Sequence, residues 1–202
     1  LEYLPGPMQP GTYTVTENLH FLEEEFETTE RDTVTIYLHG SFAEDHALES
    51  ISRARTDSPS SFITVGDRKA ETASILTVID AYAERSPSFA ALVDRSDTTG
   101  NGIPNRNLNR IYDRLLSSPF EEEASRYITD DYRETRIVYA VESDATDAAI
   151  TADATSMAGG SFRYEAVETG DVVVFQRVSE EVYSSAIEAL LLALALSLAF
   201  LT

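Results

Sequence analysis

The stretch TVTIYL, residues Thr33–Leu38, alternates apolar and polar side chains and is followed closely by Gly40. Successive side chains of a β-strand point to opposite faces, so Val34, Ile36 and Leu38 would share one face. We therefore predict a strand here, with one face on a hydrophobic core and the other face more polar.

Three further strands are predicted on either side of a helical block. They are SFITV at 61–65, RIVYAVES at 136–143 and FRYEAVE at 162–168. Helical patterns occupy 43–55 and 145–157, the second with Asp144 as its cap and Gly159 at its end. The order strand, helix, strand, strand, helix, strand predicts an α+β fold of the ferredoxin-like, split βαβ kind, with two helices on a four-stranded antiparallel sheet.

Four segments follow from this pattern. Residues 1–30 form a Pro- and Gly-rich lead-in with an N-terminal helix at about 14–26. Residues 31–67 and 133–170 form the ferredoxin-like subdomain, and 68–132 form a helical insertion. Within the insertion we expect helices at 70–84, 87–94, 105–117 and 119–128. Residues 171–202 form a terminal helix.

The terminal helix changes character along its length. Phe175, Val178, Val182 and Ala186 recur at helical spacing, whereas only Ser197 is polar between Ala189 and Leu201. A membrane span needs about 20 apolar residues, so the apolar run is too short on its own. We predict that it is the first part of a longer span, so that this helix enters a membrane. A buried core helix is the alternative.

The charge of the chain is strongly acidic. It holds 35 acidic and 15 basic residues among 202, a net charge of -20, and Lys69 is the only lysine. We interpret this as adaptation to high salt, which screens the repulsion between carboxylates. The same charge argues against nucleic acid as a partner, since binding it would need a basic surface. The absence of cysteine excludes disulfides and thiolate metal sites.

Three stretches together resemble the extracytoplasmic loops of RND-superfamily exporters, and the MMPL-type branch in particular. They are EYLP at Glu2–Pro5, TVTIYL, and ETGDVVVFQRVSE at Glu168–Glu180, which leads into the apolar run. With the acidic composition, the chain looks like a porter-type loop of a haloarchaeal member. The helical insertion has no counterpart in this resemblance.

The resemblance implies a role in transport. It implies a domain on the extracellular side of the cell membrane that contributes to the path of an apolar or amphiphilic substrate, with export driven by proton flux. Its expected partners are the rest of the parent transporter, a second similar loop and the lipid bilayer at the terminal helix. We expect no enzymatic activity. The alternative is an extracellular binding or sensor module of a membrane-anchored receptor with few spans.

One loop has the spacing of a calcium site. Asp97, Thr99 and Asn101 lie at alternate positions before Gly102, but no glutamate stands at the expected end of the loop. A turn that leads through Pro104 to the next helix is the preferred interpretation, and cation binding by Asp97–Asn101 stays open.

Other candidate residues favour structural roles. His20, His39 and His46 lack metal-ligand spacing, and the runs Glu23–Glu25 and Glu121–Glu123 suit a solvated surface better than an acid/base pair. The small residues of 145–157, with Tyr139, Phe162 and Tyr164, could line a pocket but fit core packing better. We therefore assign no catalytic, cofactor-binding or metal-binding residue.

Overall fold

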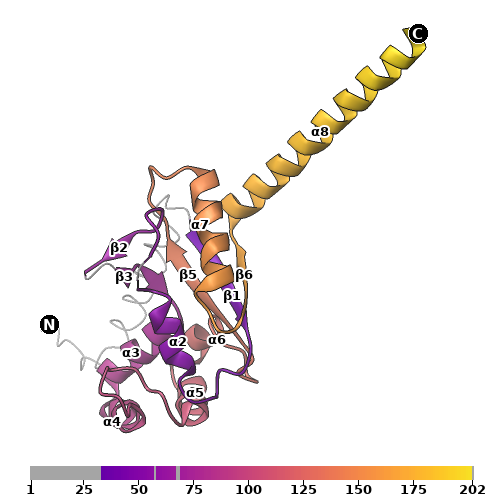
Figure 1. The fold of residues 1–202 in the computed structure, drawn as a ribbon. Coiled ribbons are helices and arrows are strands. Elements are labelled where there is room, and N and C mark those ends of the chain that lie inside the picture. Colours follow the sequence, from indigo (N-terminus) through magenta and orange to yellow (C-terminus); the bar gives the residue numbers. More distant parts are fainter. Residues whose placement is uncertain (1–32, 57, 67–68, 202) are drawn as a thin grey trace, which may run out of the picture. The chain divides into compact units, whose positions relative to one another are not determined.

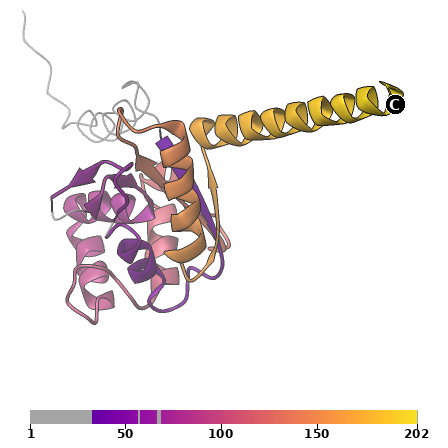
Figure 2. The same cartoon turned by 45° about the horizontal axis from the view of Figure 1, so that its top comes forward.

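The computed structural model describes residues 33–56, 58–66 and 69–201, with side chains to residue 197. All of these belong to one compact unit, Asp32–Thr202. The predicted N-terminal helix, His20 and Glu23–Glu25 lie outside the described residues. Figures 1 and 2 show the arrangement of the elements in two views.

The described residues form an α+β fold around a four-stranded antiparallel sheet in the order β4-β5-β1-β6. The strands are β1 (Thr33–His39), β4 (Thr72–Ala73), β5 (Glu134–Ala140) and β6 (Glu165–Thr169). Strand β1 lies between β5 and β6, pairing Ile36 with Ile137 on one side and with Glu168 on the other. The α+β class and the antiparallel four-stranded sheet were thus predicted correctly.

The alternation in β1 has the predicted consequence. Val34, Ile36 and Leu38 are buried, whereas Tyr37 on the opposite face is 46% exposed. Removing such aliphatic side chains from water is the main favourable contribution to folding, about 1.5–3 kcal/mol for each. The buried face of the sheet therefore fixes the register of β1 against its two neighbours.

The edge strand beside β5 differs from the prediction. The sheet uses β4 at Thr72–Ala73, whereas 61–65 contacts the end of β5 through an isolated bridge between Phe62 and Val141 and a hydrogen bond from the Ile63 amide to the Ala140 carbonyl oxygen. Thr64–Val65 (β2) instead pairs with Lys69–Ala70 (β3) as a separate two-stranded ribbon. Strands β2, β3 and β4 are each only two residues long, so an alternating sequence pattern could not show which of them joins the sheet. The first helix after this edge strand begins at Ile75, whereas we expected a helix from residue 70.

Helices fill much of the remaining chain. They are α2 (Ala47–Arg53), α3 (Ile75–Arg85), α4 (Pro87–Ser96), α5 (Leu108–Leu116), α6 (Glu121–Ser125), α7 (Asp147–Gly160) and α8 (Asp171–Leu201). Helix α7 packs along β6 and β1 and meets the start of α8. Helices α3 to α6 pack on one another, around buried side chains that include Ile79, Phe89, Ile111 and Leu115.

The junction between β6 and α8 requires a glycine. Gly170 has φ 143°, and a Cβ atom there would lie 2.7 Å from the carbonyl oxygen of Thr33. Val172 and Val173 then bury the first turn of α8, and Arg177 forms an ion pair with Glu168 of β6. The side chain of Glu168 is 8% exposed and also accepts a hydrogen bond from Thr155 of α7. The base of α8 is thereby attached to both β6 and α7.

Within the described part of the chain, no helix is long and apolar enough to cross a bilayer.

Candidate functional site

The loop between α4 and α5 closes on the carboxylate of Asp97. Its Oδ1 accepts hydrogen bonds from the backbone and hydroxyl of Thr99 and from Gly100, and its Oδ2 accepts one from Gly102. Burial acts to raise the pKa of Asp97, but these hydrogen bonds outweigh it and hold the pKa below its usual value. Gly100 and Gly102 both have positive φ, which explains why glycines occupy these positions.

The same loop is attached to α2 through Asn105 and Glu49. Asn105 is fully buried; its Oδ1 accepts hydrogen bonds from Thr98, and its Nδ2 donates one of 3.0 Å to Glu49. Glu49 also accepts hydrogen bonds from Thr99 and from His46, the latter at 2.6 Å. The bond to His46 is the main cause of a lowered pKa of Glu49; burial opposes it, and Asn105 and Thr99 add to it.

This geometry favours a structural turn over a cation site. Calcium takes six to eight oxygen ligands, whereas the oxygen atoms of Asp97 already accept hydrogen bonds from the protein. Among the described residues, no group of three or more His, Asp or Glu side chains could hold a metal ion. Pro104 does not begin the next helix as predicted, since α5 starts at Leu108.

The other residues singled out from the sequence lie apart. His39, at the end of β1, is near Glu134 of β5, and His46 contacts Glu49. Glu121–Glu123 form the first turn of α6, where negative charge favours the helix dipole. Tyr139 is fully buried beside Phe62, and the ring of Tyr164 packs on Phe42 with centroids 4.6 Å apart.

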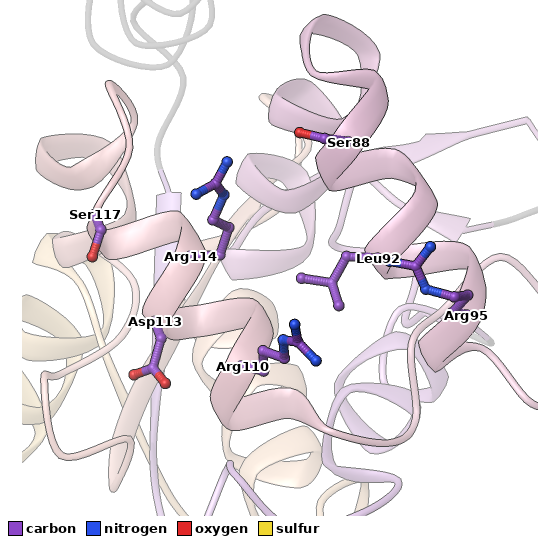
Figure 3. A pocket seen from close by; sticks show the side chains of 7 residues that line it. All are labelled: Ser88, Leu92, Arg95, Arg110, Asp113, Arg114 and Ser117. Atoms are coloured by element: carbon purple, nitrogen blue, oxygen red, sulfur yellow. The ribbon is translucent and has the colours of Figure 1, made fainter.

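A pocket that the sequence analysis did not single out lies between α4 and α5. It has a volume of about 420 Å³. Its lining comes from one face of each helix, at helical spacing: Ser88, Leu92 and Arg95 from α4, and Arg110, Asp113, Arg114 and Ser117 from α5 and its end. Figure 3 shows Leu92 between the three arginine side chains. The four-residue spacing of Arg110 and Arg114 was the available sequence signal, since basic residues are rare in this chain.

A second surface feature is the distal part of α8. The predicted stripe of Phe175, Val178 and Val182 is exposed, at 67%, 56% and 61%. The leucines at 190, 191, 192, 194 and 196 are all more than half exposed. Ser197 donates a hydrogen bond of 2.9 Å to the carbonyl oxygen of Ala193, within the helix itself. Figures 1 and 2 show no other described element beside this part of the helix.

No protein-family model matches the chain, and comparisons with curated proteins and with solved structures gave no match.

Proposed function

We propose that this chain is the extracytoplasmic domain of an RND-type membrane transporter from a halophilic microbe, and that it contributes to the path of an exported apolar or amphiphilic substrate. The observation that carries the proposal is α8, whose leucines 190–196 are exposed on all sides of the helix. A helix that is apolar all round needs burial in a protein core or in lipid. In this proposal these residues lie in the bilayer.

The details of α8 support entry into a membrane rather than a complete span. The apolar run Ala189–Leu201 rises about 20 Å along α8 at 1.5 Å per residue, which is shorter than the roughly 30 Å hydrocarbon core. The hydroxyl of Ser197 bonds to the Ala193 carbonyl, which is how a serine on a lipid-facing helix satisfies its donor. In this proposal the parent protein supplies the remainder of the span.

The sheet supports the porter part of the proposal. We assign its order, β4-β5-β1-β6 with antiparallel neighbours, to the ferredoxin-like fold, in which the first and third strands are central. Helices α3 to α6 then form an insertion between the second and third strands of that fold. Glu168 would connect the sheet domain to the membrane helix, since it binds Thr155 of α7 and Arg177 of α8.

Membrane entry can be tested with single tryptophans, because the chain contains none. Leu194→Trp and Val178→Trp would each be mixed with zwitterionic phosphatidylcholine vesicles, which do not repel the acidic chain. We expect brominated acyl chains to quench the indole of the Leu194→Trp variant and shift its emission to the blue, and to leave the Val178→Trp variant unaffected.

Two outcomes would contradict membrane entry. One is that the emission of the Leu194→Trp variant is the same with and without vesicles. The other is a blue shift that grows with protein concentration in the absence of vesicles, which would assign the leucines to a contact between copies of the chain.

The transporter assignment needs a separate test. The parent coding region should contain many apolar runs of about 20 residues, one of them completed by α8, and a second region with this domain pattern. If vesicles quench the Leu194→Trp variant but the parent has only one or two spans, the membrane-anchored sensor is correct and the transporter is wrong.

A further inference from the structure

The pocket between α4 and α5 stands out in charge from the rest of the chain. Residues 87–117 contain four arginines, at 95, 106, 110 and 114, and three aspartates, at 94, 97 and 113, which leaves a net charge of +1. The whole chain carries -20. Three of those four arginines line the same pocket.

The guanidinium groups in the pocket are available to a ligand. Within the described part of the chain, Arg95, Arg110 and Arg114 form no ion pair, whereas Arg106 lies 4.0 Å from Asp45. The one acidic side chain of the lining, Asp113, accepts a hydrogen bond from the hydroxyl of Tyr132. Figure 3 shows that the Asp113 carboxylate points away from Leu92, around which the arginines gather.

The size and chemistry of the pocket indicate a small anion. A volume of about 420 Å³ lies within the usual range of small-molecule sites, roughly 300–1,000 Å³. Each guanidinium presents a planar fork of donors that matches the oxygen atoms of carboxylate, sulfate or phosphate. The hydroxyls of Ser88 and Ser117 add donors, and Leu92 offers an apolar contact to the rest of the molecule.

High salt removes the main objection, which is repulsion of an anion by the acidic chain. At about 1 M salt the Debye length is roughly 3 Å, so distant carboxylates contribute little and direct contacts dominate. We propose that this pocket binds the oxyanion group of a small organic anion, held by Arg95, Arg110 and Arg114. The site does not depend on the membrane or transporter assignment.

The test uses the full chain in molar NaCl, with inorganic phosphate and inorganic sulfate as probes. Binding is measured by calorimetry and by NMR of the arginine Nε–Hε groups. We expect the signals of Arg95, Arg110 and Arg114 to shift on saturation and that of Arg106 to stay. Arg110→Gln should weaken binding about tenfold or more, because hydrogen bonds to charged groups are the stronger class.

Two further variants separate recognition from simple attraction. Arg110→Lys keeps the charge but loses the fork of donors, so it should also weaken binding by several fold. Arg106→Gln removes one charge from the same segment outside the pocket and should change affinity less than about twofold. All of these side chains are exposed, so the variants should fold.

The remaining outcomes either identify the carrier of the oxyanion or overturn the proposal. Phosphatidylglycerol vesicles that shift the three signals while free phosphate does not would assign the pocket to a lipid headgroup, the same oxyanion on another carrier. Equal shifts at Arg106 and at the pocket arginines would mean non-specific attraction and overturn the proposal. So would the absence of any shift with phosphate, sulfate and vesicles.

Discussion

Helices α5 and α8 use similar apolar residues with opposite results. In α5, Leu108, Ile111, Tyr112 and Leu115 are fully buried, and the polar residues lie on the other side of the helix. In α8, leucines of the same kind are 54–70% exposed from Leu190 to Leu196. The difference lies in the pattern: α5 has one apolar face, whereas the distal part of α8 has no polar face to direct it.

This contrast explains where each helix finds its partner. A helix with a single apolar face can bury that face against one contact surface. For α5, helices α4 and α6 contribute to this surface. A helix apolar on every side cannot be covered by one neighbour. Among the described residues, Val172 and Val173 are buried in the first turn of α8, whereas its large apolar side chains from Val174 to Leu196 are exposed.

The largest expected difference between the two helices is in stability. Leu115→Ala in α5 should lower the free energy of unfolding by about 2–5 kcal/mol, because it leaves a cavity in a fully packed core. Leu192→Ala, with 62% of its side chain exposed, should change it by about 0.5 kcal/mol or less. Denaturant unfolding followed by circular dichroism at constant high salt would measure both.

The contrast between α5 and α8 is wrong if Leu115→Ala and Leu192→Ala lower the free energy of unfolding by the same amount. A large effect of Leu192→Ala in dilute solution would mean that α8 packs on this chain or on a second copy. Repeating the measurement at several protein concentrations separates the two, since only association makes stability depend on concentration.

Long, regular patterns predicted the fold well, and short ones did not. The alternation in Thr33–Leu38 and the helical spacing at the start of α8 matched the structure, because several residues repeat the same period. The edge strand at Thr72–Ala73 has two residues and no period at all. Its place is set by pairing with Tyr139 and Val138, which are distant in the sequence and had already been assigned to a strand.

The candidate site residues were likewise predicted only where they lie close together in the sequence. The hydrogen bonds of Asp97 lie within one loop, and the spacing of Asp97, Thr99 and Asn101 identified that loop. The role of Glu49 was missed, because it comes from α2 and reaches Asn105 across 56 residues of chain. The arginine pocket was missed for the same reason, since α4 and α5 each contribute only part of it.

A substitution with a smaller expected effect on stability tests which contact positions the start of α5. Asn105→Ala would leave Thr98 and Glu49 without their buried partner, so we expect a loss of about 1–3 kcal/mol in unfolding free energy. Asn101→Ala is the matched control in the same loop, since Asn101 is exposed, accepts only a local hydrogen bond from the Ile103 amide, and has its Nδ2 3.5 Å from Glu49. Equal losses would show that the loop, rather than the buried amide, positions α5.

The smallest effect is the pH dependence that Glu49 contributes. Its pKa is lowered from 4.5 in the folded chain, chiefly by the hydrogen bond with His46. A lowered folded pKa stabilises the fold above about pH 4.5, and that contribution is lost as the pH falls through the folded pKa. Glu49→Gln should therefore be less stable than the unmodified chain at neutral pH, and the difference should shrink as the pH falls below about 4.5.

The control for this titration is Glu122→Gln. The Glu122 side chain is 92% exposed and lies 3.8 Å from Arg126, a surface pair of the kind that contributes little. Unfolding curves at constant salt and several pH values should show a larger pH-dependent difference for Glu49→Gln than for Glu122→Gln. If the Glu49→Gln difference stays constant down to about pH 3, the ionised carboxylate does not stabilise the contact between α2 and the loop before α5. Packing around Asn105 would then hold α5 in place by itself, whereas the described part of α8 has no comparable contact beyond its base.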